Sequence, residues 1–377
     1  IEEKMISEKQ MHTAIVIKAT GSCYTLHDLA SKATVEARLR GKLRLSGSRS
    51  TSPVVVGDIV DYEPEVLTGD QASTVSADDA SNKNEIQSNE TASETAVGED
   101  RSIASAQLSS DKAETEALGS GAPAAPATRM TGTIVALHPR RNYIIRRASN
   151  LSKESHIIAA NVDQALLMVT LRSPETPKEF ADRFLVTCEA YKVPAAILLS
   201  KIDLQDAEAV AEFRAVYEGA GYRVLEVSVR EGRGVEEVRE LLAGRTTHVS
   251  GNSGVGKSTL IQAIDPSLDI RTGEISESHH KGRHTTTFST MYPLAGGGAV
   301  IDTPGIKGFG LIDIDDAELW HYFPEMMRTA PDCRFYNCTH THEPGCAVVE
   351  AVERGQIAYP RYESYLKILD EDEKYRK

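Results

Sequence analysis

Residues 251–258 have the composition and spacing of a phosphate-binding loop. They read Gly-Asn-Ser-Gly-Val-Gly-Lys-Ser, with a β-like run over 247–250 before them and a helical pattern over 259–264 after them. In such a loop, glycines let backbone N–H groups approach phosphate oxygens, the lysine contacts the β and γ oxygens, and the last hydroxyl ligates Mg²⁺. The pattern predicts a nucleoside triphosphate site in which Lys257 and Ser258 also serve catalysis. The expected nucleotide contacts are Gly251, Asn252, Ser253, Gly254, Val255, Gly256, Lys257, Ser258 and Thr259.

A second motif, which contains an aspartate, follows the phosphate loop by about 45 residues. It reads Asp302-Thr303-Pro304-Gly305 and comes directly after the apolar run 299–301. At the end of a strand, Asp302 would hold Mg²⁺ through water, and Gly305 would offer its N–H to the γ-phosphate. Such a turn is common by itself, but its place after a phosphate loop indicates a second switch.

The segment 281–287, Lys-Gly-Arg-His-Thr-Thr-Thr, lies between these motifs and fits a first switch. One threonine would close over the metal and the γ-phosphate, with Thr285 and Thr286 as candidates between which the sequence does not decide. Ile306 stands where Ras-like enzymes place the glutamine that orients the attacking water. Slow intrinsic hydrolysis is therefore expected. His284 is the local candidate to position the water, although a solvated loop residue without a catalytic role fits the sequence equally well.

The tetrad Ser200-Lys201-Ile202-Asp203 has the pattern of a guanine-reading loop. Asp203 should accept hydrogen bonds from guanine N1–H and N2–H₂, which adenine does not offer, so the motif predicts GTP and GDP rather than ATP. Lys201 can lay its stem along the base, and Ser200 stands where asparagine is usual. Ser228 and Val229, about 25 residues later, resemble the loop whose backbone N–H touches guanine O6.

The order of these motifs along the chain is unusual. An ordinary GTPase places the phosphate loop first and the base tetrad last, whereas here the tetrad precedes the phosphate loop and the Asp302 motif ends the series. Because domain termini often lie close together, a circular permutation can leave the site intact. The second switch then leads directly into the residues after 310.

Three cysteines and a histidine, Cys333, Cys338, His340 and Cys346, follow with the spacing C-x4-C-x-H-x5-C. Three thiolates and one imidazole complete a tetrahedral Zn²⁺ site with no open position, so one structural ion per chain is expected. A disulfide is the competing interpretation. The odd total of five cysteines, the lack of a signal-like N-terminal segment and the nucleotide motifs favour zinc in a reducing cytoplasm.

The sequence predicts a multi-domain α/β and β protein. Residues 1–150 contain short β-like runs typical of an OB-like barrel, 151–312 the permuted GTPase domain, and 313–377 a helical zinc-binding domain. Residues at about 69–128 would interrupt the barrel: they hold 11 acidic and 3 basic residues, are poor in aromatic residues and are expected to be disordered.

Charge bears on the expected partner. The net charge of −13 disfavours nucleic acid, but the insertion accounts for −8 of it. Residues 129–153 contain six basic residues and no acid, and an alternating basic run adds to them. A solvated surface remains the alternative to RNA binding, in which Tyr143 would add stacking. The basic positions are Arg129, Arg140, Arg141, Arg146, Arg147, Lys153, Arg38, Arg40, Lys42 and Arg44.

Together the motifs resemble one family, the circularly permuted GTPases known as ribosome small subunit-dependent GTPase A. The resemblance covers almost the whole chain outside the insertion, and the departures are Ser200 in place of asparagine and the insertion itself. It rests on Asn161-Val162-Asp163-Gln164, Asp182-Arg183-Phe184-Leu185, the tetrad, the phosphate loop, 282–287, Asp302-Thr303-Pro304-Gly305 and the Cys/His cluster.

The resemblance implies an N-terminal OB domain, a zinc domain and GTP hydrolysis stimulated by the small ribosomal subunit. It also implies binding to 16S rRNA and release after hydrolysis. We expect a cytoplasmic monomer without a membrane segment. Two other functions remain open: a GTP-dependent RNA-binding switch whose hydrolysis is incidental, and a P-loop kinase for a small molecule, which the tetrad and the Asp302 motif disfavour.

Overall fold

The computed structural model describes residues 11–41, 53–66, 130–147, 155–268, 289–303 and 314–375. The predicted first switch with His284, Thr285 and Thr286, the residue Gly305 and the acidic insertion lie outside these ranges. So do Arg129, Lys42, Arg44 and Lys153 of the basic run.

Five strands near the N-terminus form a closed barrel. The sheet order is β1-β2-β3-β5-β4, and a β1–β4 pairing closes it. β3 pairs with β5 in parallel, whereas the β1–β2, β2–β3 and β1–β4 pairings are antiparallel. The predicted OB-like barrel is confirmed. The strands are β1 (His12–Thr20), β2 (Cys23–Asp28), β3 (Thr34–Leu39), β4 (Ile59–Val66) and β5 (Met130–Leu137).

The sequence of residues 53–62 is β-like and predicts one continuous strand, but the strand begins only at Ile59. The preceding residues form a turn because the buried Asp58 carboxylate accepts the Val55 N–H at 2.8 Å. Gly57 has a φ of +89°, and a Cβ at this position would lie 2.0 Å from the Ala160 carbonyl oxygen. The turn therefore requires glycine and packs its backbone against β7 (Ser155–Ala160).

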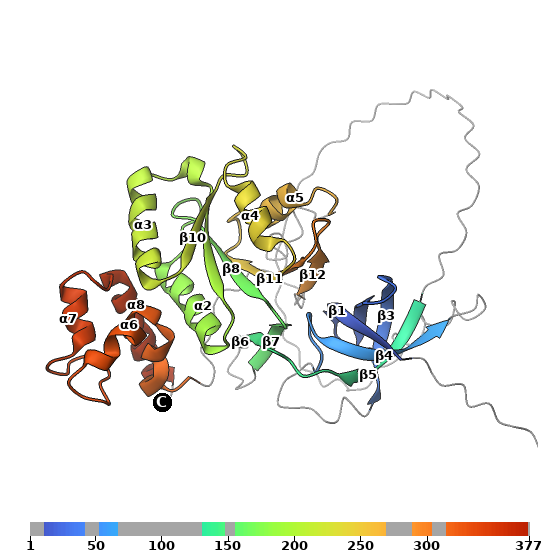
Figure 1. The fold of residues 1–377 in the computed structure, drawn as a ribbon, viewed down its shortest axis with the longest axis horizontal. Coiled ribbons are helices and arrows are strands. Elements are labelled where there is room, and N and C mark those ends of the chain that lie inside the picture. Colours follow the sequence, from blue (N-terminus) through green and yellow to red (C-terminus); the bar gives the residue numbers. More distant parts are fainter. Residues whose placement is uncertain are drawn as a thin grey trace, which may run out of the picture. The chain divides into compact units, whose positions relative to one another are not determined.

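The central region is an α/β layer structure (Figure 1). Its sheet runs β10-β9-β8-β11-β13-β12, with parallel pairings except for the antiparallel β12. Its elements are β8 (Gln164–Val169), α2 (Lys178–Ala190), β9 (Ala195–Ser200), η1 (Ile202–Leu204), α3 (Ala207–Ala220), β10 (Arg223–Val227), α4 (Val235–Leu242), β11 (Thr246–Gly251), α5 (Lys257–Ile264), β12 (Thr290–Pro293) and β13 (Ala299–Asp302); the hairpin β6 (Tyr143–Arg147) and β7 (Ser155–Ala160) precedes them.

Two apolar layers cover this sheet. Helices α2 and α3 contribute Phe184 and Phe213 to the layer on one face. Helices α4 and α5 contribute Val238 and Leu260 to the layer on the other. A sheet buried on both faces explains the continuous apolar run of β8, in which every residue is buried. Because the strands are parallel, their carboxyl ends meet at one edge, where ligands bind in such sheets.

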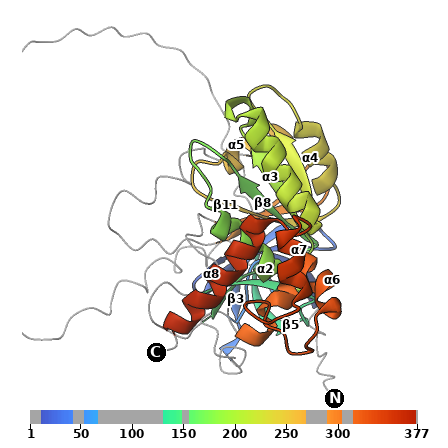
Figure 2. The same cartoon turned by 90° about the vertical axis from the view of Figure 1, so that its left-hand side faces the viewer.

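The C-terminal part of the described chain consists of short helices that pack around their own core (Figure 2). They are η3 (Asp316–Tyr322), α6 (Pro324–Thr329), η4 (Ala330–Asp332), α7 (Ala347–Glu353) and α8 (Tyr359–Tyr375). Leu319, Phe323 and Tyr365 are buried in this core. Among the described residues, no helix combines the length and the hydropathy that a membrane crossing would need.

A buried charged cluster joins α8 to α2 and α6. The Arg361 guanidinium donates to Glu325 through Nε, at 2.7 Å, and to Asp182 through Nη1. It also lies over the Phe323 ring, 4.7 Å from the centroid. Arg361 and Asp182 are each 1% exposed, so this ion pair is shielded from water. Asp182, part of the family-like motif in α2, therefore has a structural partner 179 residues away.

Candidate functional site

The predicted phosphate loop connects β11 to the N-terminus of α5, as its strand-loop-helix context required. Gly251, Gly254 and Gly256 have positive φ angles of 150°, 82° and 101°. A Cβ at Gly251 would lie 2.5 Å from the Met168 carbonyl oxygen. The loop therefore depends on glycine for both conformation and close packing. Ser253, Gly254 and Thr259 are exposed, and the N-terminus of α5 points its free N–H groups toward the loop.

Lys257 and Asp302 are buried and influence each other electrostatically beneath this loop. The Lys257 ammonium donates to the carbonyl oxygens of Gly251 and Asn252, at 2.6 and 2.9 Å. Burial lowers the pKa of Lys257, and the nearby Asp302 carboxylate opposes that shift. Burial raises the pKa of Asp302 to about 6, and Lys257 opposes that shift. Burial therefore disfavours the charged form of both groups. An anionic ligand near Lys257 or a cation near Asp302 would favour that form.

The Asp302 carboxylate fits a magnesium ion. Asp302 is 5% exposed, and its Oδ1 atom has no hydrogen-bond partner. Buried carboxylate oxygens normally have partners, so an unpaired one at the end of a strand indicates a missing ligand. Ser258, half-buried in the first turn of α5, supplies the hydroxyl that the loop pattern assigns to Mg²⁺. Hard oxygen donors of this kind suit Mg²⁺.

The predicted base-reading residues gather at the same sheet edge. Asp203 follows β9, and its Oδ1 accepts a hydrogen bond from the Ser228 hydroxyl at 2.7 Å. Ser228 is buried at the end of β10, whereas the Asp203 side chain is half-exposed. Ser228 thus holds Asp203 in place and leaves part of its carboxylate accessible. Val229 follows Ser228 and packs against the apolar layer of α4 and α5.

The base tetrad lies beside the phosphate loop. Ser200 is 3% exposed, and its Oγ atom would lie 3.6 Å from a Cβ placed on Gly256. Lys201 adopts a left-handed conformation with φ of 55° and donates through Nζ to the Ser173 carbonyl oxygen at 2.8 Å. The tetrad and the phosphate loop, separated by some 50 residues in the sequence, therefore form one surface.

The loop after β8 borders this surface and was not predicted. The Thr170 hydroxyl donates to the Pro174 carbonyl oxygen, and the Thr176 hydroxyl accepts the Thr170 N–H at 3.1 Å. Pro174 would contact a Cβ on Gly254 at 3.6 Å. The sequence held one signal for this loop. The loop follows the apolar strand β8, which runs parallel to β11, so both strands end at the same edge of the sheet.

The predicted zinc ligands converge. The ligand atoms of Cys333, Cys338, His340 and Cys346 lie within 4.8 Å of one another. His340 Nδ1 lies 3.6 Å from Cys333 Sγ and 3.4 Å from Cys346 Sγ, and these two sulfur atoms are 3.9 Å apart. A tetrahedron with Zn–S bonds of about 2.3 Å has edges of about 3.8 Å. The cluster therefore fits zinc, and its cysteines are free rather than disulfide-bonded.

Neighbouring groups shape the cysteine cluster. The Glu343 carboxylate accepts the N–H groups of Thr339 and Thr341, at 2.8 and 3.1 Å. The Tyr362 hydroxyl donates to the His340 carbonyl oxygen at 2.8 Å. Cys346 caps α7 by accepting the Val349 N–H at 3.5 Å. These contacts hold the ligand loop against α7 and α8, and of the ligand atoms they use only the Cys346 Sγ.

Part of the predicted basic surface has an internal role. Arg140 binds the buried Asp58 through two nitrogens, at 2.7 and 2.8 Å, and Arg141 pairs with Asp163 at 2.7 Å. Arg140 is largely buried in its ion pair, whereas Arg141 stays 60% exposed, so RNA binding by the rest of this basic surface stays a prediction. Arg40 likewise pairs with Glu63 at 3.2 Å.

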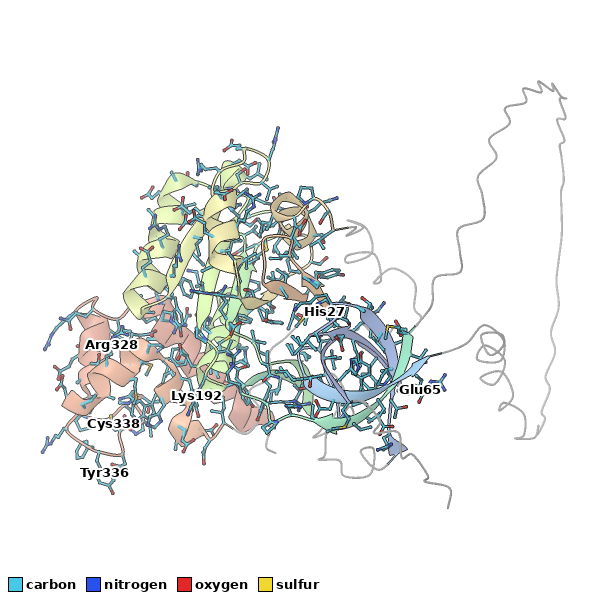
Figure 3. The ribbon with its side chains drawn as sticks, turned by 45° about the vertical axis from the view of Figure 1, so that its right-hand side comes forward. His27, Glu65, Lys192, Arg328, Tyr336 and Cys338 are labelled. Carbon is cyan, nitrogen blue, oxygen red and sulfur yellow. The ribbon has the colours of Figure 1, made fainter. Side chains whose placement is uncertain are left out.

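One further expectation for this surface changes. Tyr143 is half-buried, and the centroid of its ring lies 5.0 Å from that of Tyr191. The ring therefore packs within the protein, where stacking on RNA had been expected. Arg38 stays exposed on β3. By contrast, Tyr336 in the cysteine loop is fully exposed, on the same loop as Cys338 (Figure 3). The exposed aromatic residue was not among those predicted.

The strand order, the convergence of phosphate loop and base tetrad at one edge, and the appended barrel define a circularly permuted GTPase. Solved structures support this class. The crystal structure of YjeQ from Thermotoga maritima matches with a TM-score of 0.64 at 30% identity and covers 96% of this chain and 98% of that one. YloQ, described as a circularly permuted GTPase, matches with a TM-score of 0.61, covers 100% and 99%, and at 22% identity shows the fold alone.

Sequence comparisons identify the family. The family model described as RsgA GTPase matches residues 137–312, and the RsgA N-terminal domain matches residues 13–71. A small ribosomal subunit biogenesis GTPase RsgA from Porphyromonas gingivalis is 44% identical over 370 residues, 96% of this chain and 98% of that relative. A protein of the same name from Flavobacterium psychrophilum is 39% identical over 368 residues, 97% and 94% of the two chains. The chain belongs to the RsgA GTPase family, and the predicted resemblance is confirmed.

Proposed function

We propose that this protein hydrolyses GTP as a late maturation factor of the small ribosomal subunit, binds its 16S rRNA and leaves after hydrolysis. One observation carries the GTPase part. The phosphate loop, Asp203 and Asp302 follow or end three different parallel strands and therefore lie at the same edge of the sheet. The names of the relatives from Porphyromonas gingivalis and Flavobacterium psychrophilum support the ribosomal part.

Each residue at this edge has a proposed task. Backbone N–H groups of the phosphate loop bind the phosphates, and Lys257 exchanges its present carbonyl partners for β and γ oxygens. Asp203, held by Ser228, reads guanine N1–H and N2–H₂. When bound through Ser258 and Asp302, Mg²⁺ would neutralise charge on the β and γ phosphates. The first switch, with Thr285 or Thr286, and Gly305 would complete the site, and His284 would position the attacking water.

We assign three parts to this function. The barrel within residues 1–150 and the zinc domain of 313–377 dock on RNA, while residues 151–312 bind and hydrolyse GTP. The Cys/His cluster holds one structural Zn²⁺ per chain. The barrel and cysteine loop retain exposed Arg38 and Tyr336 for RNA contacts. We further propose a cytoplasmic monomer, since the ribosomal partner is cytoplasmic and no part of the proposed site needs a second copy.

GTP turnover with and without purified small subunits tests this function directly. We expect slow release of phosphate by the protein alone and a large stimulation by small subunits. Lys257→Ala should abolish both rates, whereas the matched control Lys178→Ala, at an exposed position on α2, should retain them. Equal rates with and without subunits, or equal hydrolysis of ATP and GTP, would contradict the proposal.

A binding experiment tests the switch separately. The permuted connection carries the second switch directly into the C-terminal helices, so nucleotide state should alter subunit affinity. We expect tighter subunit binding with a non-hydrolysable GTP analogue than with GDP, by a coupling of about 1–3 kcal/mol. Identical affinities in the two states would show that the connection transmits no signal, even if hydrolysis is intact.

A further inference from the structure

A buried histidine lies beneath the proposed nucleotide site and has no role in the mechanism above. His248 belongs to β11, the strand that leads into the phosphate loop, and is fully buried. Its Nε2 atom lies 3.1 Å from the Thr303 hydroxyl. Its Nδ1 atom is buried and has no hydrogen-bond partner. Burying a polar ring in an apolar layer costs stability unless its nitrogen atoms are hydrogen-bonded, and here only Nε2 is.

The hydrogen bond reaches the first part of the proposed second switch. Thr303 directly follows Asp302, the last residue of β13, and is 3% exposed. Adjacent residues of an extended chain point to opposite sides. The Asp302 carboxylate interacts with Lys257 below the phosphate loop, while Thr303 meets His248. His248 therefore restrains the chain at Thr303, on the side opposite the one on which Asp302 faces the proposed metal.

The surroundings keep the imidazole ring neutral and in place. Burial lowers the pKa of His248 to about 3, so the ring is uncharged at neutral pH. A neutral imidazole has one donor and one acceptor nitrogen, and a threonine hydroxyl can pair with either. Phe184 of α2 lies parallel to the ring, with an interplanar angle of 17° and centroids 6.3 Å apart. Packing and one hydrogen bond thus define the position of Nε2.

We propose that His248 is a positioning residue for the second switch: its Nε2 holds the Thr303 hydroxyl and thereby keeps the Asp302 carboxylate directed at the Mg²⁺ position. This inference rests on the proposed function, because it assigns Asp302 to magnesium. The inference adds His248, a core residue of the sheet, to the residues that position the proposed Mg²⁺ ligand Asp302. The restraint is present without nucleotide, so it reduces the ordering of Asp302 that metal binding requires.

The test is the Mg²⁺ dependence of nucleotide binding. Calorimetric titration with a non-hydrolysable GTP analogue at increasing Mg²⁺ concentrations measures the affinity for the analogue. It gives the Mg²⁺ concentration at which half of the increase in that affinity is reached. His248→Phe keeps the ring and removes both nitrogens, and it should raise that concentration about two- to tenfold, the loss expected for one hydrogen bond. His248→Gln places an amide near the Nε2 position and should restore most of the dependence.

Thermal unfolding separates positioning from packing. His248→Phe removes the unpaired Nδ1 but leaves the buried Thr303 hydroxyl without its partner, so its melting temperature without nucleotide should stay near that of the parent protein. A role in packing alone would lower the melting temperature and leave the Mg²⁺ dependence unchanged, which would overturn the proposal. If His248→Phe does not fold, an unchanged Mg²⁺ dependence in Thr303→Val would overturn it instead.

A double-mutant cycle identifies the contact itself. Thr303→Val should produce a Mg²⁺ shift similar to that of His248→Phe, and the double variant should shift no further. Thr187→Val is the matched control, because Thr187 is a buried threonine of α2 whose hydroxyl binds the Arg183 carbonyl oxygen at 2.8 Å. Additive shifts would refute the contact. If the parent protein binds the analogue without any effect of Mg²⁺, both this inference and the metal assignment fail, whereas unchanged Mg²⁺ dependence in the His248 variants refutes this inference alone.

Discussion

Arg361→Met should detach the C-terminal helices from α2. Arg361 is the largest fully buried side chain in the described part of the chain, and its guanidinium lies between Asp182 and Glu325. Methionine fills much of the same volume without charge. The substitution therefore leaves two buried carboxylates without the arginine that pairs with both of them in the described part of the chain. Water cannot replace the lost partner without opening the interface.

The expected cost is large because the charges left behind are buried. Breaking a buried ion pair by removing one partner costs about 3–5 kcal/mol. An exposed helix pair contributes only about 0.3–0.5 kcal/mol. Arg354, which is 66% exposed and pairs with Glu350 at i,i+4, supplies the matched control Arg354→Met. The difference between the two variants isolates the effect of burial from that of losing an arginine.

The single tryptophan of the chain reports on this region. Trp320 packs edge-on against His340, with ring centroids 4.9 Å apart, so its fluorescence follows the C-terminal helices. Urea titration monitored by this fluorescence should show an early transition in Arg361→Met and a nearly parental one in Arg354→Met. The deficit should shrink as the pH falls. Burial raises the pKa of Asp182 despite the opposing attraction of Arg361, so without that attraction protonation at mildly acidic pH relieves the unpaired charge.

Equal midpoints for Arg361→Met and Arg354→Met would refute this reasoning. So would a deficit that grows on acidification, because it would mean that the carboxylates are not the source of the instability. Replacing all three members of the cluster by neutral residues provides a further check. If the cost comes from unpaired charge, that triple variant should be more stable than Arg361→Met.

Three other predictions concern the nucleotide and zinc sites. Cys346→Ser should lose the bound zinc and unfold the C-terminal helices locally, since binding energy at such a site is folding energy; elemental analysis and Trp320 fluorescence would check this. Asp203→Asn should weaken GTP binding about tenfold or more and relax discrimination against ATP, whereas Ser200→Asn should tighten GTP binding modestly, both measured by calorimetry. Unchanged GTP affinity in Asp203→Asn would contradict the base assignment. His284→Ala should spare GTP binding but lower subunit-stimulated turnover, and an unchanged stimulated rate would leave His284 as an ordinary loop residue.

The nucleotide motifs were predictable because their chemistry is local. Glycines that permit positive φ angles, a lysine and a hydroxyl must follow one another in a phosphate loop, so the segment 251–258 carries its own evidence. The same holds for the cysteine cluster, whose four ligands fall within 14 residues. The short β-like runs within residues 1–150 likewise predicted barrel strands, and those at 13–17 and 131–137 lie in β1 and β5.

Only the tertiary structure decided which charged and polar groups are free. Arg140 is indistinguishable from a phosphate-binding arginine in the sequence, but its partner Asp58 lies 82 residues away. His248 meets Thr303 across 55 residues, and Arg361 meets Asp182 across 179. Such pairings depend on which strands and helices become neighbours, and residue spacing along the chain does not encode that. The sequence by itself therefore determined the chemistry of each local motif, whereas folding determined the partners that hold these motifs in place.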